Sequence, residues 1–209
     1  MSKKVIIFDM DGVLFDTIDL ARKSFIDRHP SVTVDMYNEI HSGNFPAEAE
    51  KYSHLQVHES DEERDEKFKR YAEMKGRASL FEGMKDLLEC LHKEHYILVM
   101  NTNAYAKNCL PLLEHTGIQS LFDFIPTAEV SKDKVEKFKL IEQKFNIDIR
   151  DSLFVTDALG DVRDADIAGV PTVAVTWGVH DESFFKRERH DNLIGIAHTI
   201  EELTRFIKG

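Results

Sequence analysis

Cysteine is scarce in this chain of 209 residues, which contains two, Cys90 and Cys109. Both fall within apolar patterns of helical spacing, so we expect buried, unreactive thiols and neither a disulfide nor a zinc site. Long hydrophobic runs are missing as well. The apolar run near the amino terminus, residues 5–8, is too short for a signal peptide or a membrane-spanning helix. These absences predict a cytoplasmic protein that does not contact membranes.

Positive charge is in deficit. The chain has 27 lysine and arginine residues against 38 aspartate and glutamate residues, which gives a formal net charge of -11. A surface of this sign repels the phosphates of nucleic acids and of anionic lipids, so neither is an expected partner. A phosphate-binding site in such a protein has to be locally positive or has to recruit a metal ion. Monomer and homodimer are both left open.

Short apolar runs are what the chain has in quantity. Runs rich in β-branched and aromatic residues occur at 5–8, 96–100, 153–156 and 172–176, with a weaker one at 123–126. Helical patterns lie between and after them, at 84–93, 105–115, 135–145, 162–168 and 201–208. This alternation predicts an α/β fold with a doubly wound parallel sheet. In such sheets, functional residues gather at the carboxyl ends of the strands.

One segment interrupts this alternation. Between residues 18 and 78 no buried strand pattern occurs, and helical or polar patterns fill the segment. We therefore predict a core formed by residues 1–15 and 80–209. Residues 16–79 would form a small helical cap inserted after the first strand.

The strongest signal is the string VIIFDMDGVLFD at residues 5–16. A buried strand delivers Asp9 and Asp11 to the loop at its carboxyl end, where Gly12 allows a tight turn. Two carboxylates at this spacing can divide nucleophilic and proton-transfer roles if their environments separate their pKa values. An acidic turn after a strand is the alternative, but the whole string is more specific than the pair. It resembles the first motif of the haloacid dehalogenase (HAD) superfamily, which residues Asp9 to Asp16 match position by position.

The resemblance implies a Rossmann-like core with a helical cap, and phosphoryl transfer through Asp9. Asp9 would be the nucleophile that forms an aspartyl phosphate, and Asp11 would be the general acid and base. Dehalogenases of the superfamily lack the second aspartate. The resemblance therefore favours phosphoryl transfer over cleavage of a carbon–halogen bond.

A second motif of the superfamily is a serine or threonine at the end of a strand, usually followed by asparagine. Thr102 and Asn103 follow the run at 96–100 and match it. A hydroxyl and a neighbouring N–H group can bind phosphoryl oxygens without adding charge. The resemblance therefore implies that these two residues contact the substrate phosphate.

The third motif is a lysine at a helix start, for which Lys132 and Lys134 are both candidates. Lys132 has the spacing to an apolar residue, here Phe138, that cap-bearing subfamilies show, but both prolines that accompany that lysine are missing. Asp133 and Glu136 form a pair typical of a capping box, which would make Lys134 the first helical residue. We favour Lys134, and Lys132 stays open.

The fourth motif is an acidic pair after a strand, matched by Asp157 and Asp161. Magnesium prefers oxygen ligands and keeps several waters. The resemblance implies that Asp9, the backbone carbonyl of Asp11 and Asp157 would hold Mg²⁺. Asp161 would orient this cluster from outside the first coordination shell.

Residues around the fourth motif have their own interpretations. Thr156 stands where the superfamily usually has glycine, and its branched side chain could crowd the metal loop. Asp164 and Asp166 are best explained as solvated positions on the following helix. Neither is expected to bind the metal.

The function implied is that of a magnesium-dependent phosphatase acting on a small phosphorylated metabolite. The cap would close over the site, and Phe15, Asp16 and the loop at residues 41–46 are expected to contact the substrate or form the hinge. A phosphomutase of the same fold, similar to β-phosphoglucomutase, is the alternative. A non-enzymatic phospho-accepting module, such as a receiver domain, is disfavoured because it lacks an insertion after the first strand.

Overall fold

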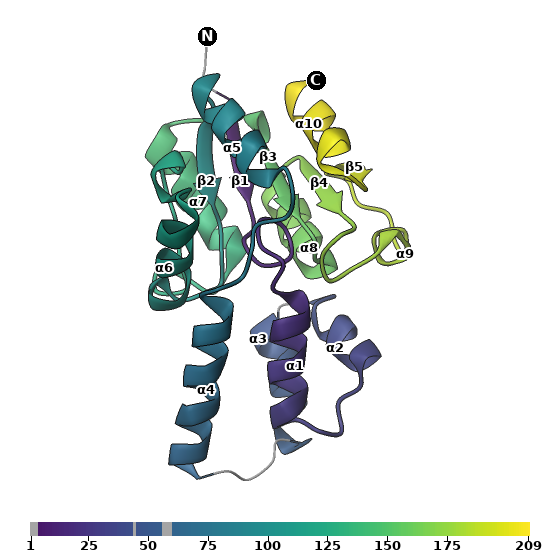
Figure 1. Ribbon diagram of the computed structural model, residues 1–209. Coiled ribbons are helices and arrows are strands. Elements are labelled where there is room, and N and C mark those ends of the chain that lie inside the picture. Colours follow the sequence, from purple (N-terminus) through teal and green to yellow (C-terminus); the bar gives the residue numbers. More distant parts are fainter. Residues whose placement is uncertain (1–3, 44, 56–59) are drawn as a thin grey trace.

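The computed structural model describes residues 4–43, 45–55 and 60–209 (Figure 1). Within these ranges one parallel sheet has the strand order β2-β1-β3-β4-β5. Its strands are β1 (Val5–Phe8), β2 (Ile97–Met100), β3 (Ser152–Thr156), β4 (Thr172–Val175) and β5 (Leu193–Ala197). The predicted α/β fold with a doubly wound parallel sheet is confirmed. The chain order reverses beside β1, and a crevice at the carboxyl ends of the strands is expected there.

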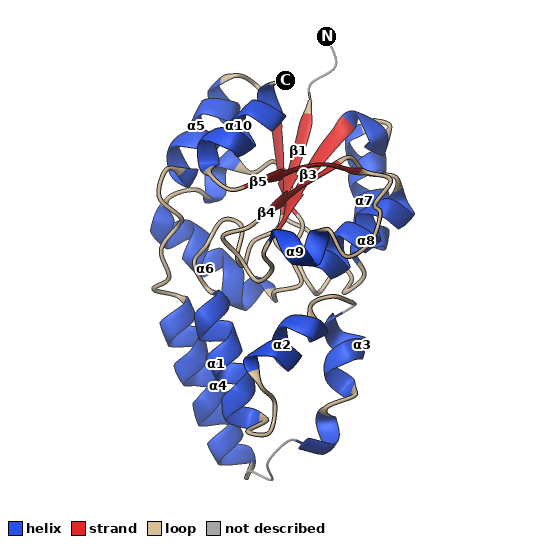
Figure 2. Ribbon diagram, turned by 90° about the vertical axis from the view of Figure 1, so that its right-hand side faces the viewer, coloured by secondary structure: helices blue, strands red, loops and turns tan. Residues whose placement is uncertain are grey.

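The helices surround this sheet and extend beyond one end of it. They are α1 (Ile18–Arg28), α2 (Val34–Ile40), α3 (Phe45–Glu50), α4 (Asp61–Lys75), α5 (Met84–Lys93), α6 (Ala106–Thr116), α7 (Lys134–Phe145), α8 (Leu159–Ala168), α9 (Glu182–Phe185) and α10 (Ile200–Lys208). Figure 2 shows α5 and α10 on one face of the sheet and α7 and α8 on the other. The sheet is thus covered on both faces.

The two faces of β1 pack into different parts of the core. Ile6 and Phe8 lie with the apolar side chains of α5, α6 and α10. Val5 and Ile7 lie with those of α7 and α8. Successive side chains of a strand point to opposite faces, so a strand buried on both sides needs an unbroken apolar run. This is why the run at residues 5–8 has no polar member.

Two strand predictions were wrong. The weak candidate at residues 123–126 forms a single bridge between Phe124 and Val99 and no strand, since Pro126 has no N–H with which to extend the pairing. Strand β5 was not predicted. It lies at the edge of the sheet, and its apolar residues, LIGIA, are interrupted by Gly195, which weakens a strand pattern.

Helices α1–α4 occupy the segment for which a cap was predicted. They lie together beyond the carboxyl ends of the strands, with α1 and α4 running side by side (Figure 1). The apolar side chains of α1, α2 and α3 pack around Phe25, Tyr37 and Ile40, and Ala158 and Val179 from loops of the core join this cluster. The insertion is therefore seated on the loops that follow β3 and β4.

The cysteines are free thiols, Cys109 buried and Cys90 half-buried. The burial predicted for both thiols is thus confirmed for Cys109, whereas Cys90 is only partly buried. Among the described residues, no helix combines the length and apolar character that crossing a bilayer requires.

Candidate active site

The end of β1 forms the floor of a cavity of 570 Å³ between the sheet and the inserted helices. Asp9 and Asp11 both line it, together with Asp157 from the loop after β3. Gly12 has φ of 76°, and a Cβ atom there would lie 2.0 Å from Oδ2 of Asp157. Only glycine therefore lets the β1 loop and the Asp157 carboxylate approach this closely. The predicted meeting of the two acidic motifs at one cavity is what the structure shows.

Lys134 joins the carboxylates of the two motifs. Its Nζ lies 2.8 Å from Oδ1 of Asp9 and 2.6 Å from Oδ2 of Asp161, and its side chain is 3% exposed. The Asp133 side chain accepts a hydrogen bond from Val135 N at 2.8 Å, so α7 begins at Lys134 and aims it into the cavity. Thr156 Oγ1 donates to Oδ2 of Asp161 at 2.7 Å. Thr156 thus supports the acidic pair and does not crowd it.

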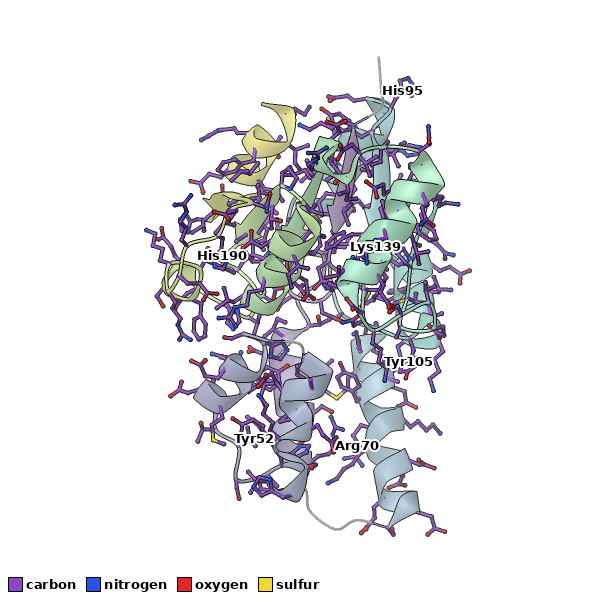
Figure 3. The ribbon with its side chains drawn as sticks, turned by 180° about the vertical axis from the view of Figure 1, so that it is seen from behind. Tyr52, Arg70, His95, Tyr105, Lys139 and His190 are labelled. Carbon is purple, nitrogen blue, oxygen red and sulfur yellow. The ribbon has the colours of Figure 1, made fainter. Side chains whose placement is uncertain are left out.

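Lys132 has a different position. It is exposed at the rim of the same cavity, with its Nζ 5.7 Å from the ring centre of Tyr105. Tyr105 lies where the core faces α4 (Figure 3). Of the two candidate lysines, Lys134 is therefore the one in contact with Asp9.

The buried carboxylates carry more negative charge than Lys134 offsets. Burial raises the pKa of Asp9 to about 6, although Lys134 acts in the opposite direction. Burial and the neighbouring Asp9 carboxylate raise the pKa of Asp157 well above its usual range. Burial works against the charge of Lys134, but the carboxylates of Asp161 and Asp9 raise its pKa. A further positive charge beside these carboxylates would stabilise their ionised forms.

The donor set fits a magnesium ion. Asp9 and Asp157 supply hard carboxylate oxygens on the same cavity, and the Asp9 carboxylate disfavours ionisation of Asp157. Asp161 is already engaged by Lys134 and Thr156, which suits an orienting role. Within the described ranges no group of three acidic, histidine or cysteine side chains is arranged to hold a metal by itself. A magnesium ion held here would therefore depend on a backbone oxygen and waters as well, as Mg²⁺ commonly does.

Asp11 is held by residues at both ends of the inserted helices. Lys75 Nζ, at the last residue of α4, lies 2.7 Å from Oδ2 of Asp11. Thr17 Oγ1, just before α1, donates to Oδ1 at 2.6 Å. The Lys75 side chain is 6% exposed, so this ion pair is largely shielded from water. The carboxylate of Asp11 is thereby fixed in orientation by the insertion.

Thr102 and Asn103 lie at the end of β2 and line the cavity. Thr102 Oγ1 accepts a hydrogen bond from Ala104 N at 3.0 Å, which leaves its hydroxyl hydrogen available to donate. Lys137 Nζ donates to the Thr102 carbonyl at 2.6 Å and to Asn103 Oδ1 at 2.7 Å.

Lys75 and Lys137 were missed by sequence reasoning. Lys137 follows Lys134 by three residues, which places both on one face of α7, and this spacing was an available signal. For Lys75 there was no local signal, because it meets Asp11 across 64 positions of the chain.

Phe15 and Asp16 were predicted to contact the substrate or to form the hinge, and neither lies at the cavity wall. Phe15 is fully buried in the core cluster beneath the site, and Asp16 is exposed. In the loop at residues 41–46, His41, Gly43 and Phe45 do line it. Asn44 lies outside the described residues.

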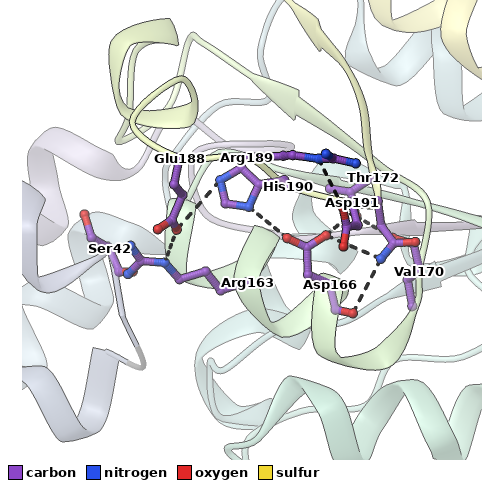
Figure 4. A network of polar contacts seen from close by, with 10 residues as sticks. Ser42, Arg163, Asp166, Val170, Thr172, Glu188, Arg189, His190 and Asp191 are labelled. Carbon is purple, nitrogen blue, oxygen red and sulfur yellow. Dashed lines mark hydrogen bonds and ion pairs between the residues drawn. The ribbon is translucent and has the colours of Figure 1, made fainter.

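The solvated positions predicted for Asp164 and Asp166 were also wrong. Asp164 lines the cavity, and burial together with Asp161 raises its pKa to about 6. Asp166 lies 2.8 Å from Nδ1 of His190 and accepts a hydrogen bond from Asn192 N, as Figure 4 shows. Asp166 thus holds the segment at residues 190–192 against α8, just before β5 begins.

Comparison with known proteins agrees with this arrangement. A family model described as haloacid dehalogenase-like hydrolase matches residues 6–175. The chain is 26% identical over 226 residues to a phosphoglycolate phosphatase of Mesorhizobium japonicum, covering 100% of this chain and 98% of that protein. It is 28% identical over 201 residues to an N-acetylmuramic acid 6-phosphate phosphatase of Pseudomonas putida, covering 87% of each. A haloacid dehalogenase-like family hydrolase from Streptococcus pneumoniae has a similar structure, with a TM-score of 0.76 at 21% identity and 99% of both chains covered.

These findings bear on several expectations drawn from the motifs. The structural likeness confirms the fold, and relatives named phosphatases confirm the predicted class of enzyme. The match to the family model begins in β1 and ends in β4, so it spans the strands that present Asp9, Thr102 and Asp157. The chain therefore belongs to the haloacid dehalogenase-like hydrolase family.

Proposed function

We propose that this chain hydrolyses a small phosphoric monoester through an aspartyl phosphate on Asp9. One observation carries the proposal: Asp9, Asp11, Asp157 and Lys134 line a single cavity at the carboxyl end of the sheet. These residues come from different elements, and the cavity is where a doubly wound sheet offers a binding crevice. A nucleophile, a proton donor and a buried cation are thus available to one phosphoryl group.

The reaction follows from the placement of the two β1 carboxylates. The Asp9 carboxylate attacks phosphorus, and the bond from phosphorus to the leaving oxygen breaks as Asp11 gives that oxygen a proton. Asp11 then takes a proton from water, which attacks the phosphorus of the acyl phosphate and releases phosphate with Asp9 restored. Lys75 and Thr17 hold Asp11 in the orientation that both steps require.

Charge on the transferring group is offset by residues around it. Lys134 contacts Asp9 directly, and Thr102 can donate its hydroxyl to a phosphoryl oxygen. A magnesium ion held by Asp9, Asp157 and the backbone carbonyl of Asp11 would add positive charge. This charge would reduce the repulsion between the Asp9 carboxylate and the phosphoryl oxygens of the substrate. Asp161 keeps Lys134 in place.

A small metabolite is the substrate class that fits. The cavity of 570 Å³ falls in the range of small-molecule sites, ~300–1,000 Å³. The two relatives reported above are named for different small phosphate esters, so the names support the class and not one compound. Helices α1–α4 would act as a cap that excludes water from the first step, since they supply Phe25, Tyr37 and Tyr71 to the cavity wall.

The decisive test is hydrolysis of p-nitrophenyl phosphate with Mg²⁺ by the wild type and by Asp9→Asn. We expect wild-type activity that chelator abolishes, and a loss of at least about a thousandfold in the variant, because a nucleophile cannot be replaced by an amide. Asp19→Asn is the matched control, since Asp19 is an aspartate of α1 whose side chain is 91% exposed. Near wild-type activity of Asp9→Asn would refute the assignment of the nucleophile.

A phosphomutase of the same fold would transfer the phosphoryl group back to a sugar and not to water. The two reactions are separated by their products from a single sugar phosphate. We expect release of one inorganic phosphate for each substrate consumed. Formation of an isomer without phosphate release would favour the mutase.

A further inference from the structure

Lys137 has no direct role in the proposed reaction. It lies on α7, one turn beyond Lys134, and is fully buried. An ammonium group transferred out of water is costly unless polar partners replace the water. Its partners here are the Thr102 carbonyl and Asn103 Oδ1, at 2.6 and 2.7 Å. Both belong to the loop that lines the cavity opposite Asp157.

The contact with Asn103 determines what that side chain can offer. An ammonium group only donates hydrogen bonds, so the amide oxygen of Asn103 has to face Lys137. The NH₂ group of the amide is then the part that Asn103 can present to an acceptor. Since Asn103 is exposed and lines the cavity, an anionic oxygen of the substrate is a suitable acceptor.

The contact with the Thr102 carbonyl fixes the backbone of the same loop. The peptide that follows Thr102 is held at its oxygen by Lys137, and Thr102 Oγ1 accepts from Ala104 N at 3.0 Å. The hydroxyl hydrogen of Thr102 is left to donate. Lys137 thus holds two uncharged donors, a hydroxyl and an amide, on one side of the cavity.

We propose that Lys137 is a positioning residue of the phosphoryl site, which orients Thr102 and Asn103 so that both donate to oxygens of the transferring group. This inference rests on the proposed phosphatase function and assigns it a residue beyond the family motifs. Asp9, Asp161 and Asp133 favour the charged form of Lys137, while burial and Lys134 oppose it and lower its pKa to about 8. The ammonium form is therefore present at pH 7.

A double-mutant cycle with Lys137→Met and Asn103→Ala tests this role. We expect each single variant to lower kcat/KM for p-nitrophenyl phosphate by about 10–100-fold, somewhat less than the loss of a direct oxyanion donor. If Lys137 acts by orienting Asn103, the double variant is at most about threefold worse than the poorer single one, because effects exerted through one shared contact do not add. The inhibition constant for inorganic phosphate is expected to rise in the same variants.

Lys139→Met is the matched control. Lys139 lies on the same helix but is exposed (Figure 3), so its variant should stay within twofold of wild type. Thermal midpoints are measured for all variants. Should Lys137→Met fail to fold, Lys137→Leu, which also lacks a donor, replaces it in the cycle.

The outcomes separate this inference from the proposed function. A wild type without phosphatase activity would overturn both. An active wild type combined with a Lys137 variant within threefold of it would overturn the positioning role alone. The positioning role would also be overturned if the loss of kcat/KM in the double variant equalled the product of the two single losses. That result would show that Lys137 and Asn103 act independently.

Discussion

At the scale of single residues, Asp157 is a buried carboxylate whose negative charge is unfavourable unless a cation offsets it. Burial and the Asp9 carboxylate raise its pKa well above the ordinary value of 3.8. The native state then binds more protons than the unfolded chain once the pH exceeds that ordinary value, so stability falls as pH rises through the raised pKa. We expect Asp157→Asn to raise the thermal midpoint in chelator at pH 7.5, by roughly 2–4 °C for each kcal/mol relieved.

The same variant has two internal checks. Asparagine keeps an oxygen that can accept the hydrogen bond of 2.7 Å from Val179 N, so the gain reports the loss of charge and not the loss of this contact. The gain should shrink as the pH is lowered toward 3.8, because Asp157 then becomes protonated in the unfolded wild type as well. A lower midpoint than wild type at pH 7.5 would contradict the electrostatic explanation.

At the scale of elements, the first turn of α8 packs directly against residues 41–43 of the insertion. Gly160 N donates to His41 O at 2.9 Å, and a Cβ atom at Gly160 would lie 2.2 Å from Gly43 O. That oxygen is backbone and cannot move alone. We expect Gly160→Ala to push residues 41–43 away and lower kcat/KM by about 10–100-fold, since small displacements at a reacting site are costly.

Alanine favours helix over glycine, so weakening of α8 itself cannot cause this loss. Gly76→Ala at the end of α4 is the comparison variant, because the added methyl group meets nothing nearer than Ala72 O at 3.3 Å. A small effect there with a large one at Gly160 would locate the defect at the seam between α8 and the insertion. Equal activity of Gly160→Ala and wild type would show that this close contact is dispensable.

At the scale of the whole molecule, stability should be linked to the cation. A ligand that binds only the native state at a hundred times its dissociation constant adds about 2.7 kcal/mol. For a chain of 209 residues this corresponds to a rise in the thermal midpoint of roughly 5–10 °C on saturation with Mg²⁺. The net charge of -11 means that any salt also relieves repulsion, so the comparison is made in NaCl of equal ionic strength. No difference between the two salts would argue against a magnesium site.

Patterns within short stretches of this sequence were enough for much of the fold. The unbroken apolar run of β1 demands burial on both faces, and the acidic loop after it has to lie at the carboxyl edge of the sheet. Asp133 as a helix cap was enough to place Lys134 at the start of α7. By contrast, β5 was not predicted although its residues are apolar, because Gly195 divides them into two short pieces.

Tertiary structure alone decided which side chains meet. Lys75 reaches Asp11 across 64 positions, and Lys137 reaches Thr102 across 35, through the packing of α4 and α7 against the sheet ends. The burial of Phe15 likewise depends on the core cluster that closes over it. Spacing along a chain specifies which face of an element a residue occupies, but the distance between two elements depends on how their apolar faces pack together.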